Sequence, residues 1–334
     1  MKPDTHKTHF RRTICRLARQ ALKSLPKHSP AYKEAMLRRV KPMDYLRCAE
    51  FPLAYRQLSL MPAMRVLDVA SPQWFSLCLA YQHPDIDFYY VNILEDELKQ
   101  TRETAQFLHI QNIHYIREDC RSLSFVDDFF HRAVSLSAIE HITPDVGGDV
   151  LALKEIHRVL KPGGELVLSV PLKETASLVY TDEHPVWERS KQKNNFYMRN
   201  YDMSQLDRLA EETNFKLILK MLIFERMGIF AMEYWEGGPG KYHPSKNWVI
   251  KLKKKIDKLA GLRLENLLAN IYIKLEDEAA SGDRLINVVA TFSKGRVIAA
   301  LKAGASCCTH LRDPVARISP FLISMVASFF PAYH

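Results

Sequence analysis

Glycine is scarce in this sequence and is absent from its first part. The 334 residues include 12 glycines, and none precedes Gly147. Phosphate-binding loops of the P-loop and G-x-G-x-x-G types need glycine where the backbone approaches the phosphate. The chain before Gly147 therefore holds neither kind of loop.

Paired cysteines and long apolar runs are also missing. The six cysteines form no C-x-x-C pair and show no zinc-site spacing. A disulfide framework is not expected in a chain of this length, so we predict a reducing compartment, the cytoplasm. No N-terminal apolar run of signal-peptide type occurs, and no 18-residue apolar stretch is long enough to span a bilayer. The longest apolar run, 321–330, has about half the length of a span.

Excess positive charge is confined to the N-terminal segment. Residues 1–45 hold 12 Lys and Arg against three acidic residues, whereas the remainder is balanced. Within 10–25, apolar residues recur at helical spacing opposite a basic face. Two interpretations stay open: a helix packed on the main domain, or a surface anchor on anionic lipid. Nucleic acid is not expected as a partner, because the sequence has no RNP1 or helix-turn-helix motif.

The middle of the chain alternates between short apolar segments and helical segments. This alternation predicts an α/β fold, a doubly wound and mostly parallel sheet. The expected strands are 65–70, 87–93, 112–118, 132–137, 165–171, 215–224 and 284–293.

Three regions follow from this pattern. Residues 1–59 form the basic helical arm, 60–295 the main domain, and 296–334 a C-terminal tail. Two inserts interrupt the domain, a lid at 172–201 and a helical insert at 225–283. The apolar end of the tail, 318–330, is expected either to lie at a lipid interface or to be buried on the domain or in a dimer.

Polar side chains follow several of the predicted strands. Asp68, Asn92, Asp119 and His141 lie at or just after strand ends. Ligands of open α/β sheets bind at the carboxyl ends of the strands, so these residues predict a ligand site there.

Residues 119–171 carry a resemblance to a known family. The stretches DCRSLSF, DDFFHRAVSLSAIEHI and LKEIHRVLKPGGELVLSVP resemble class I S-adenosylmethionine-dependent methyltransferases of the type 11 small-molecule branch. The resemblance covers about 60–224 and 284–293. It implies a seven-stranded Rossmann-like sheet and S-adenosylmethionine as cofactor, with Gly163 and Gly164 ending the preceding helix.

The resemblance also implies a set of cofactor-binding residues. It places the methionine moiety beside the loop after Asp68, the ribose at Asn92 and the adenine amino group at Asp119. The complete set is Asp68, Ala70, Ser71, Asn92, Ile93, Asp119, Cys120 and Ser137.

Several positions depart from the family pattern. Ala70, Pro72 and Trp74 replace its three glycines, Asn92 replaces an acidic residue, and His131 replaces an aspartate. Three interpretations follow: an active enzyme with an unusual cofactor loop, a catalytically inactive scaffold or binding subunit, and a nucleotide-like site with another reaction. We favour the active enzyme.

The expected reaction is O-methylation of a small molecule, a lipid or a glycan. Transfer to a hydroxyl needs a nearby base, for which Glu140 and His141 are candidates, with His184 in the lid. Ser137 replaces the first glutamate of a related E-x-x-E-H metal element, so no metal is predicted. The expected acceptor pocket comprises Trp187, Arg189, Tyr197, Arg199 and Tyr201, although any one of them fits a simple packing role.

Overall fold

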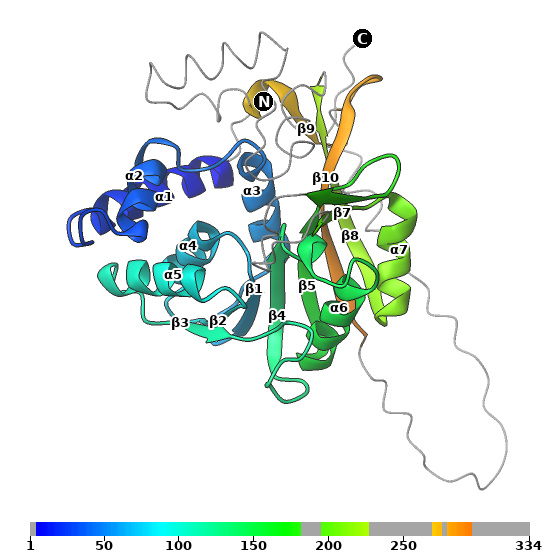
Figure 1. The fold of residues 1–334 in the computed structure, drawn as a ribbon, viewed down its shortest axis with the longest axis horizontal. Coiled ribbons are helices and arrows are strands. Elements are labelled where there is room, and N and C mark those ends of the chain that lie inside the picture. Colours follow the sequence, from blue (N-terminus) through cyan, green and yellow to red (C-terminus); the bar gives the residue numbers. More distant parts are fainter. Residues whose placement is uncertain (1–4, 182–194, 227–268, 276–278, 296–334) are drawn as a thin grey trace, which may run out of the picture. The chain divides into compact units, whose positions relative to one another are not determined.

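The computed structural model describes residues 5–181, 195–226, 269–275 and 279–295. The chain from Met1 to Arg296 forms one compact unit (Figure 1). The C-terminal tail, most of the helical insert and the centre of the lid lie outside the described residues.

A central sheet organises this unit. Its strand order is β3-β2-β1-β4-β5-β10-β8-β9. Neighbours from β3 to β5 pair in parallel, whereas β10 is antiparallel to both β5 and β8 (Figure 1). The strands are β1 (Arg65–Val69), β2 (Asp87–Asn92), β3 (Ile113–Arg117), β4 (Phe130–Leu136), β5 (Leu160–Val170), β8 (Phe215–Glu225), β9 (Ile273–Leu275) and β10 (Arg284–Lys294).

The prediction of a mostly parallel, doubly wound sheet is confirmed. The predicted number of seven strands is wrong by one, because β9 adds an antiparallel edge to β8. The short sequence of β9 shows no alternation that distinguishes it from its surroundings. A separate hairpin of β6 (Ser177–Thr181) and β7 (Asn195–Asn200) flanks the undescribed centre of the lid.

Helices cover both faces of the sheet because alternate strand residues are buried in opposite directions. Val66 belongs to the core under one face and Leu67 to the core under the other. The first core includes residues of α4 (Gln73–Gln82) and α5 (Glu95–Phe107). The second includes residues of α6 (Gly148–Val159) and α7 (Met203–Glu212).

The N-terminal helices pack on the first face. Phe10, Ile14 and Leu17 of α1 (Thr5–Ala21) are fully buried. The structure therefore shows the arm as a helix packed on the main domain, and contact of its basic face with anionic lipid stays a prediction. The expected helical stretch 31–59 divides into α2 (Pro30–Val40) and α3 (Arg47–Leu58). The interruption includes Pro42, which disfavours helical backbone in the residue before it.

The predicted helix end at Gly163 and Gly164 is wrong. Helix α6 ends at Val159, and Leu160 already pairs with Phe130 of β4. Gly163 has a φ of +78°, a left-handed conformation within the first residues of β5. A Cβ at Gly164 would lie 2.8 Å from the Lys161 carbonyl oxygen, so this position also requires glycine.

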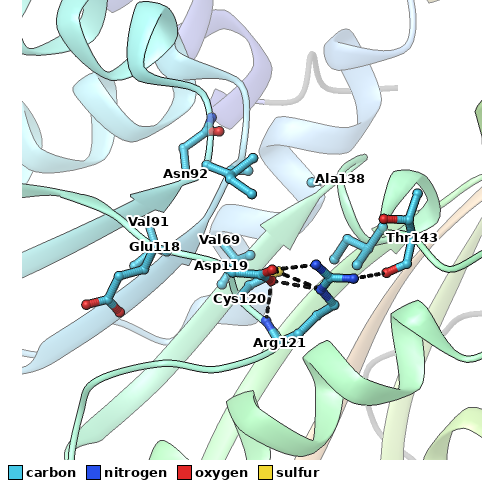
Figure 2. A pocket seen from close by; sticks show the side chains of 12 residues that line it. Val69, Val91, Asn92, Glu118, Asp119, Cys120, Arg121, Ala138 and Thr143 are labelled. Carbon is cyan, nitrogen blue, oxygen red and sulfur yellow. Dashed lines mark hydrogen bonds and ion pairs between the residues drawn. The ribbon is translucent and has the colours of Figure 1, made fainter. Parts of the chain in front are cut away.

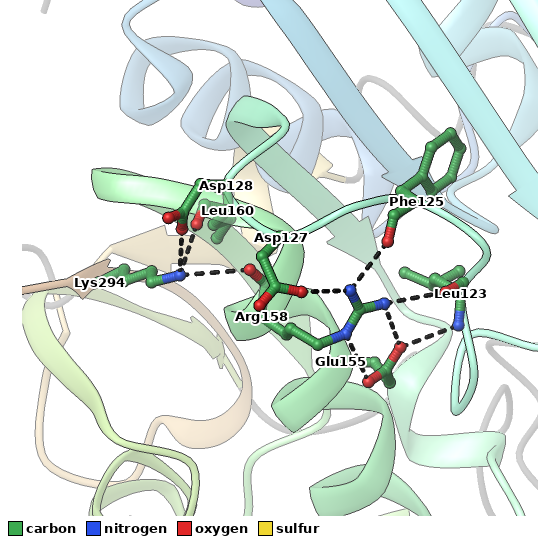
Figure 3. A network of polar contacts seen from close by, with 8 residues as sticks. All are labelled: Leu123, Phe125, Asp127, Asp128, Glu155, Arg158, Leu160 and Lys294. Atoms are coloured by element: carbon green, nitrogen blue, oxygen red, sulfur yellow. Dashed lines mark hydrogen bonds and ion pairs between the residues drawn. The ribbon is translucent and has the colours of Figure 1, made fainter.

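Two basic side chains fasten the loop between β3 and β4 and the end of β10 (Figure 3). Arg158 of α6 donates to the carbonyls of Leu123 and Phe125 in the loop. It also forms ion pairs with Asp127 and Glu155. Lys294 pairs with Asp128 at 2.7 Å and donates to the Leu160 carbonyl. These contacts fix the loop that begins at the candidate site.

In the part of the chain that the structure describes, no helix combines the length and apolarity needed to cross a membrane. The described cysteines, Cys15, Cys48, Cys78 and Cys120, are all free thiols.

Candidate active site

Two adjoining hollows lie where the parallel strands end. The first, here called the strand-end hollow, has a volume of about 60 Å³ and is lined from β1, β2 and the segments after β3 and β4 (Figure 2). The second, the α3 cavity, has a volume of about 420 Å³ and includes Arg47 and Phe51 of α3. Ala70 lines both hollows. The strand ends therefore form one continuous candidate site.

Most of the predicted cofactor residues line these hollows. The strand-end hollow is lined by Ala70, Asn92, Ile93, Asp119 and Cys120. Ser71 and Ser137 line the α3 cavity. Asp68 lines neither and lies fully buried behind the loop.

Asp68 shapes the loop after β1. Its carboxylate accepts a hydrogen bond from the Ser71 backbone N–H at 3.1 Å and one from the Ser76 hydroxyl at 2.5 Å. Burial raises the pKa of Asp68 to about 6, although both serines lower it. Ala70 adopts a φ of +50°, a left-handed conformation that glycine accepts more easily. The loop therefore keeps a glycine-type turn without glycine.

Pro72 and Trp74 form a wall of the α3 cavity. Pro72 precedes the first residue of α4, and the Trp74 side chain is only 4% exposed. Both residues line the cavity, whose volume is about 420 Å³. The rings that replace the family's glycines narrow this space but do not fill it.

Asn92 is held by the beginning of α5. Its Nδ2 donates to Glu97 at 2.9 Å, and its Oδ1 accepts the Leu94 backbone N–H at 2.9 Å. A ribose at this position would have to share these groups. The neighbouring Ile93 side chain is exposed and offers an apolar edge to the hollow.

Asp119 forms an ion pair with Arg121, and both side chains line the strand-end hollow (Figure 2). The Arg121 Nη2 lies 2.5 Å from Asp119 Oδ2, and its Nη1 donates to the Thr143 carbonyl at 2.7 Å. The hydrogen bonds from Arg121 lower the pKa of Asp119. Burial raises the pKa of the adjacent Cys120 thiol to about 12, so it is neutral at physiological pH.

A buried polar network joins α3 to the ends of β4 and β5. Glu50 is fully buried and accepts from the Ser137 hydroxyl at 2.8 Å and the Ser169 hydroxyl at 2.5 Å. Arg47 pairs with Glu50 and donates to Ser137 at 2.7 Å. Neither Arg47 nor Glu50 was predicted from the sequence as a site residue. The available signal was a glutamate within the apolar segment CAEFPLAY, on a helix whose other residues are mostly buried.

His141 lies in the α3 cavity in a defined tautomer. Its Nδ1 lies 2.7 Å from the Tyr197 carbonyl oxygen, which can only accept a hydrogen bond. Nδ1 therefore carries the proton. Burial lowers the pKa of His141 to about 4, so the ring is neutral at pH 7 and Nε2 is a proton acceptor.

Glu140 is fully buried beside this histidine. One of its carboxyl oxygens lies 3.9 Å from His141 Nε2, and neither has a hydrogen-bond partner among the described residues. Burial raises the pKa of Glu140 to about 8, and Glu50 adds to the rise. Glu140 is therefore predominantly protonated at pH 7, which leaves His141 as the stronger candidate base.

The predicted acceptor residues do not come together in one cavity within the described part of the chain. Arg199 and Tyr201 line a different hollow of about 510 Å³. Arg199 donates to carbonyls after β4, including Ile142 at 2.8 Å, and Tyr201 donates to Asp149 at 2.9 Å. Both side chains therefore bond to other groups of the protein and stabilise its fold. His184, Trp187 and Arg189 lie outside the described residues.

The chain is similar to a known protein family over part of its length. The family described as "Methyltransferase domain" matches residues 67–168, from β1 to the second half of β5. The matched segment contains the strand-end hollow and both Glu140 and His141. No curated protein matches the sequence significantly.

The solved structures to which this chain is similar are distant from it in sequence. A methyltransferase described as putative from Bacillus halodurans is 16% identical, covers 74% of this chain and 99% of its own, and gives a TM-score of 0.46. A sarcosine dimethylglycine methyltransferase, also described as putative, from Galdieria sulphuraria is 17% identical, covers 81% and 92%, and gives 0.45.

Proposed function

We propose that the protein is an S-adenosylmethionine-dependent methyltransferase that methylates a hydroxyl oxygen of a small molecule, a lipid or a glycan. The match of residues 67–168 to the family described as "Methyltransferase domain" supports methyl transfer. The choice of an oxygen acceptor rests on the position and protonation state of His141. It is a neutral base in a cavity of about 420 Å³ that shares Ala70 with the strand-end hollow.

S-Adenosylmethionine fits the residue types at this site, with one rearrangement. The loop at Ala70 and Ser71 would hold the methionine moiety, Asn92 the ribose and Asp119 the adenine amino group. A hollow of about 60 Å³ admits a nucleoside only if a lining side chain moves. Arg121 is the candidate, since its side chain is 33% exposed and can turn toward solvent.

The cofactor supplies a methyl group on a positively charged sulfur, which is already a good leaving group. The protein aligns the acceptor and receives its proton. His141 Nε2 would take the hydroxyl proton, while the Tyr197 carbonyl holds the opposite nitrogen of the ring. Residues of α3 line the cavity and help to exclude water from the reacting groups.

The cavity also indicates the polarity of the acceptor. Arg38, Asp44 and Arg47 line one side, and Trp74 and Phe51 provide apolar surface. Arg38 is already paired with Glu34 at 2.7 Å and with Asp44 at 3.1 Å. This mixed lining suits a hydroxyl-bearing molecule with an apolar portion.

A second candidate function is an inactive methyltransferase-like scaffold or binding subunit. The observation that favours it is the internal pairing of Asn92 and Asp119, the predicted ribose and adenine contacts in the strand-end hollow. Asn92 is bonded to Glu97 and the Leu94 N–H, and Asp119 to Arg121. A scaffold with no nucleoside to bind would keep these pairs permanently.

We further propose that the protein acts in the cytoplasm and makes peripheral contact with a membrane. The free thiols in the described part of the chain are consistent with a reducing compartment. The basic face of α1 remains exposed after its apolar face is buried, so it is accessible to an anionic surface.

Methyl transfer is tested with S-adenosylmethionine labelled with tritium in its methyl group, incubated with lipid and polar cell extracts. We expect labelled product from the native chain. His141→Gln should lower kcat by about 10²–10⁴-fold, because it removes the base but leaves a side chain of similar polarity. The acid limb of the native pH profile should fall near pH 4, the pKa of His141, rather than near 6.5.

The control is calorimetric binding of S-adenosylhomocysteine, which His141→Gln should leave unchanged. A folded chain that binds this ligand but yields no labelled product in either extract would favour the scaffold. Equal turnover by the native chain and His141→Gln would remove the histidine from the reaction.

A further inference from the structure

A cationic groove runs between α1 and α2, which pack side by side (Figure 1). Its volume is about 1010 Å³. Six basic side chains line it, and no acidic side chain is among its described lining residues: Arg11, Arg12, Arg16, Arg19, Lys23 and Arg39. None of the six forms an ion pair with an acidic residue in the described ranges. The groove therefore concentrates positive potential that the protein itself does not neutralise.

The groove is a fixed part of the fold. Phe10, Ile14 and Leu17 anchor α1 in the core, and Phe10 stacks on Phe75 of α4 with a centroid distance of 5.8 Å. This anchoring turns the opposite face of α1 outward, where Arg12, Arg19 and Lys23 are exposed. Since the apolar face is already buried, α1 itself does not insert into lipid.

Helix α2 adds exposed apolar side chains beside these charges. Met36, Leu37 and Val40 are 37%, 42% and 36% exposed, and Val40 also lines the groove. A surface that combines lysine and arginine with exposed apolar side chains is suited to the interface of an anionic bilayer. Nucleic acid fits less well, because no aromatic ring is among the described residues that line the groove, and single strands are usually held by ring stacking.

We infer that the α1–α2 face is a docking surface for an anionic phospholipid bilayer. The basic side chains of the groove contact lipid phosphates, and Met36, Leu37 and Val40 enter the headgroup layer. This face lies next to the candidate active site. Pro42 lines both the groove and the α3 cavity. Arg39 lines the groove, and the adjacent Arg38 lines the α3 cavity. Resting on the proposed function, this proximity assigns the acceptor to molecules at the membrane surface.

The docking surface is tested by flotation of the full chain with phosphatidylcholine vesicles that contain 30% phosphatidylserine, without cofactor or acceptor. We expect binding that is lost on pure phosphatidylcholine and weakened at high salt. Arg12→Gln, Arg19→Gln and Lys23→Gln together should lower the partition coefficient at least about tenfold. The matched control, Lys99→Gln, Lys154→Gln and Lys216→Gln, removes the same charge from exposed positions elsewhere and should bind like the native chain.

Leu37→Ser tests the apolar contribution and should weaken flotation with no change in net charge. Equal loss in the groove and control variants would overturn the assignment to this face, leaving only non-specific charge attraction. Displacement of the vesicles by single-stranded RNA at equal phosphate concentration would also overturn it, in favour of nucleic acid. Because no methyl transfer is measured, failure of the methyltransferase proposal would not affect the result.

Discussion

At the scale of single residues, Glu140 links burial directly to pH dependence. Its pKa is raised from an ordinary value of 4.5 to about 8, chiefly by burial. The folded state therefore retains a proton that the unfolded chain releases. The resulting stabilisation is complete below about pH 4.5 and is lost as the pH rises through 8.

Glu140→Gln should remove this loss, because the amide resembles the protonated acid and has no charge to bury. We expect the free energy of unfolding in urea to match the native chain at pH 4.5. At pH 9 the variant should be more stable by roughly 2–4 kcal/mol. Equal stability of the two chains at pH 9 would show that the Glu140 carboxylate is ionised without penalty.

Arg121 is the residue whose movement the proposed cofactor site requires. Arg121→Ala should release the Asp119 carboxylate for the adenine amino group and tighten S-adenosylhomocysteine binding by roughly fivefold. Asp119→Ala should weaken binding by a similar factor. If calorimetry gave the same affinity for both variants and the native chain, adenine would lie away from the strand-end hollow.

At the scale of elements, α3 joins the N-terminal helices to the site through Glu50. Glu50→Ala would remove the acceptor of hydrogen bonds from the Ser137 hydroxyl and the buried Ser169 hydroxyl, and the ion-pair partner of Arg47. We expect it to lower the free energy of unfolding by about 3 kcal/mol. Glu50→Gln keeps one acceptor oxygen and should lose less. A loss below about 1 kcal/mol in the alanine variant would mean that water replaces the carboxylate.

The strands and most helices follow from local patterns in the sequence. The predicted strands at 215–224 and 284–293 differ from β8 and β10 by one residue each, because apolar runs bounded by polar residues mark buried strands. The predicted cap of α6 at Gly163 and Gly164 is wrong, because α6 ends at Val159 and the glycine pair lies within the first residues of β5. Local pattern does not show that Leu160 already has a partner in β4.

The site could be predicted only in part. Strand-end positions such as Asn92 and Asp119 follow from the alternation and the resemblance, and both line the strand-end hollow. Their internal partners could not be predicted, because Arg121 has several carboxylates within reach along the sequence. Glu50 could not be linked to Ser137, since 87 residues separate them and only the packing of α3 brings them together.

At the scale of the whole chain, the N-terminal segment differs from the rest both in its charge and in which of its side chains are buried. The excess positive charge lies within residues 1–45. The structure buries the apolar face of α1, and most of the described basic side chains of the segment remain exposed. The matched methyltransferase segment, 67–168, contributes the strand ends, and α3 contributes a wall of the adjoining cavity. The N-terminal helices are therefore part of the proposed active site as well as its proposed contact with lipid.

The central claim is that the strand-end hollow still accepts the nucleoside of S-adenosylmethionine, although alanine, proline and tryptophan replace the family's glycines. Calorimetric titration of the full chain with S-adenosylhomocysteine tests it most directly. We expect saturable one-to-one binding that Asp119→Ala weakens. A folded chain that releases no heat at millimolar ligand would contradict it.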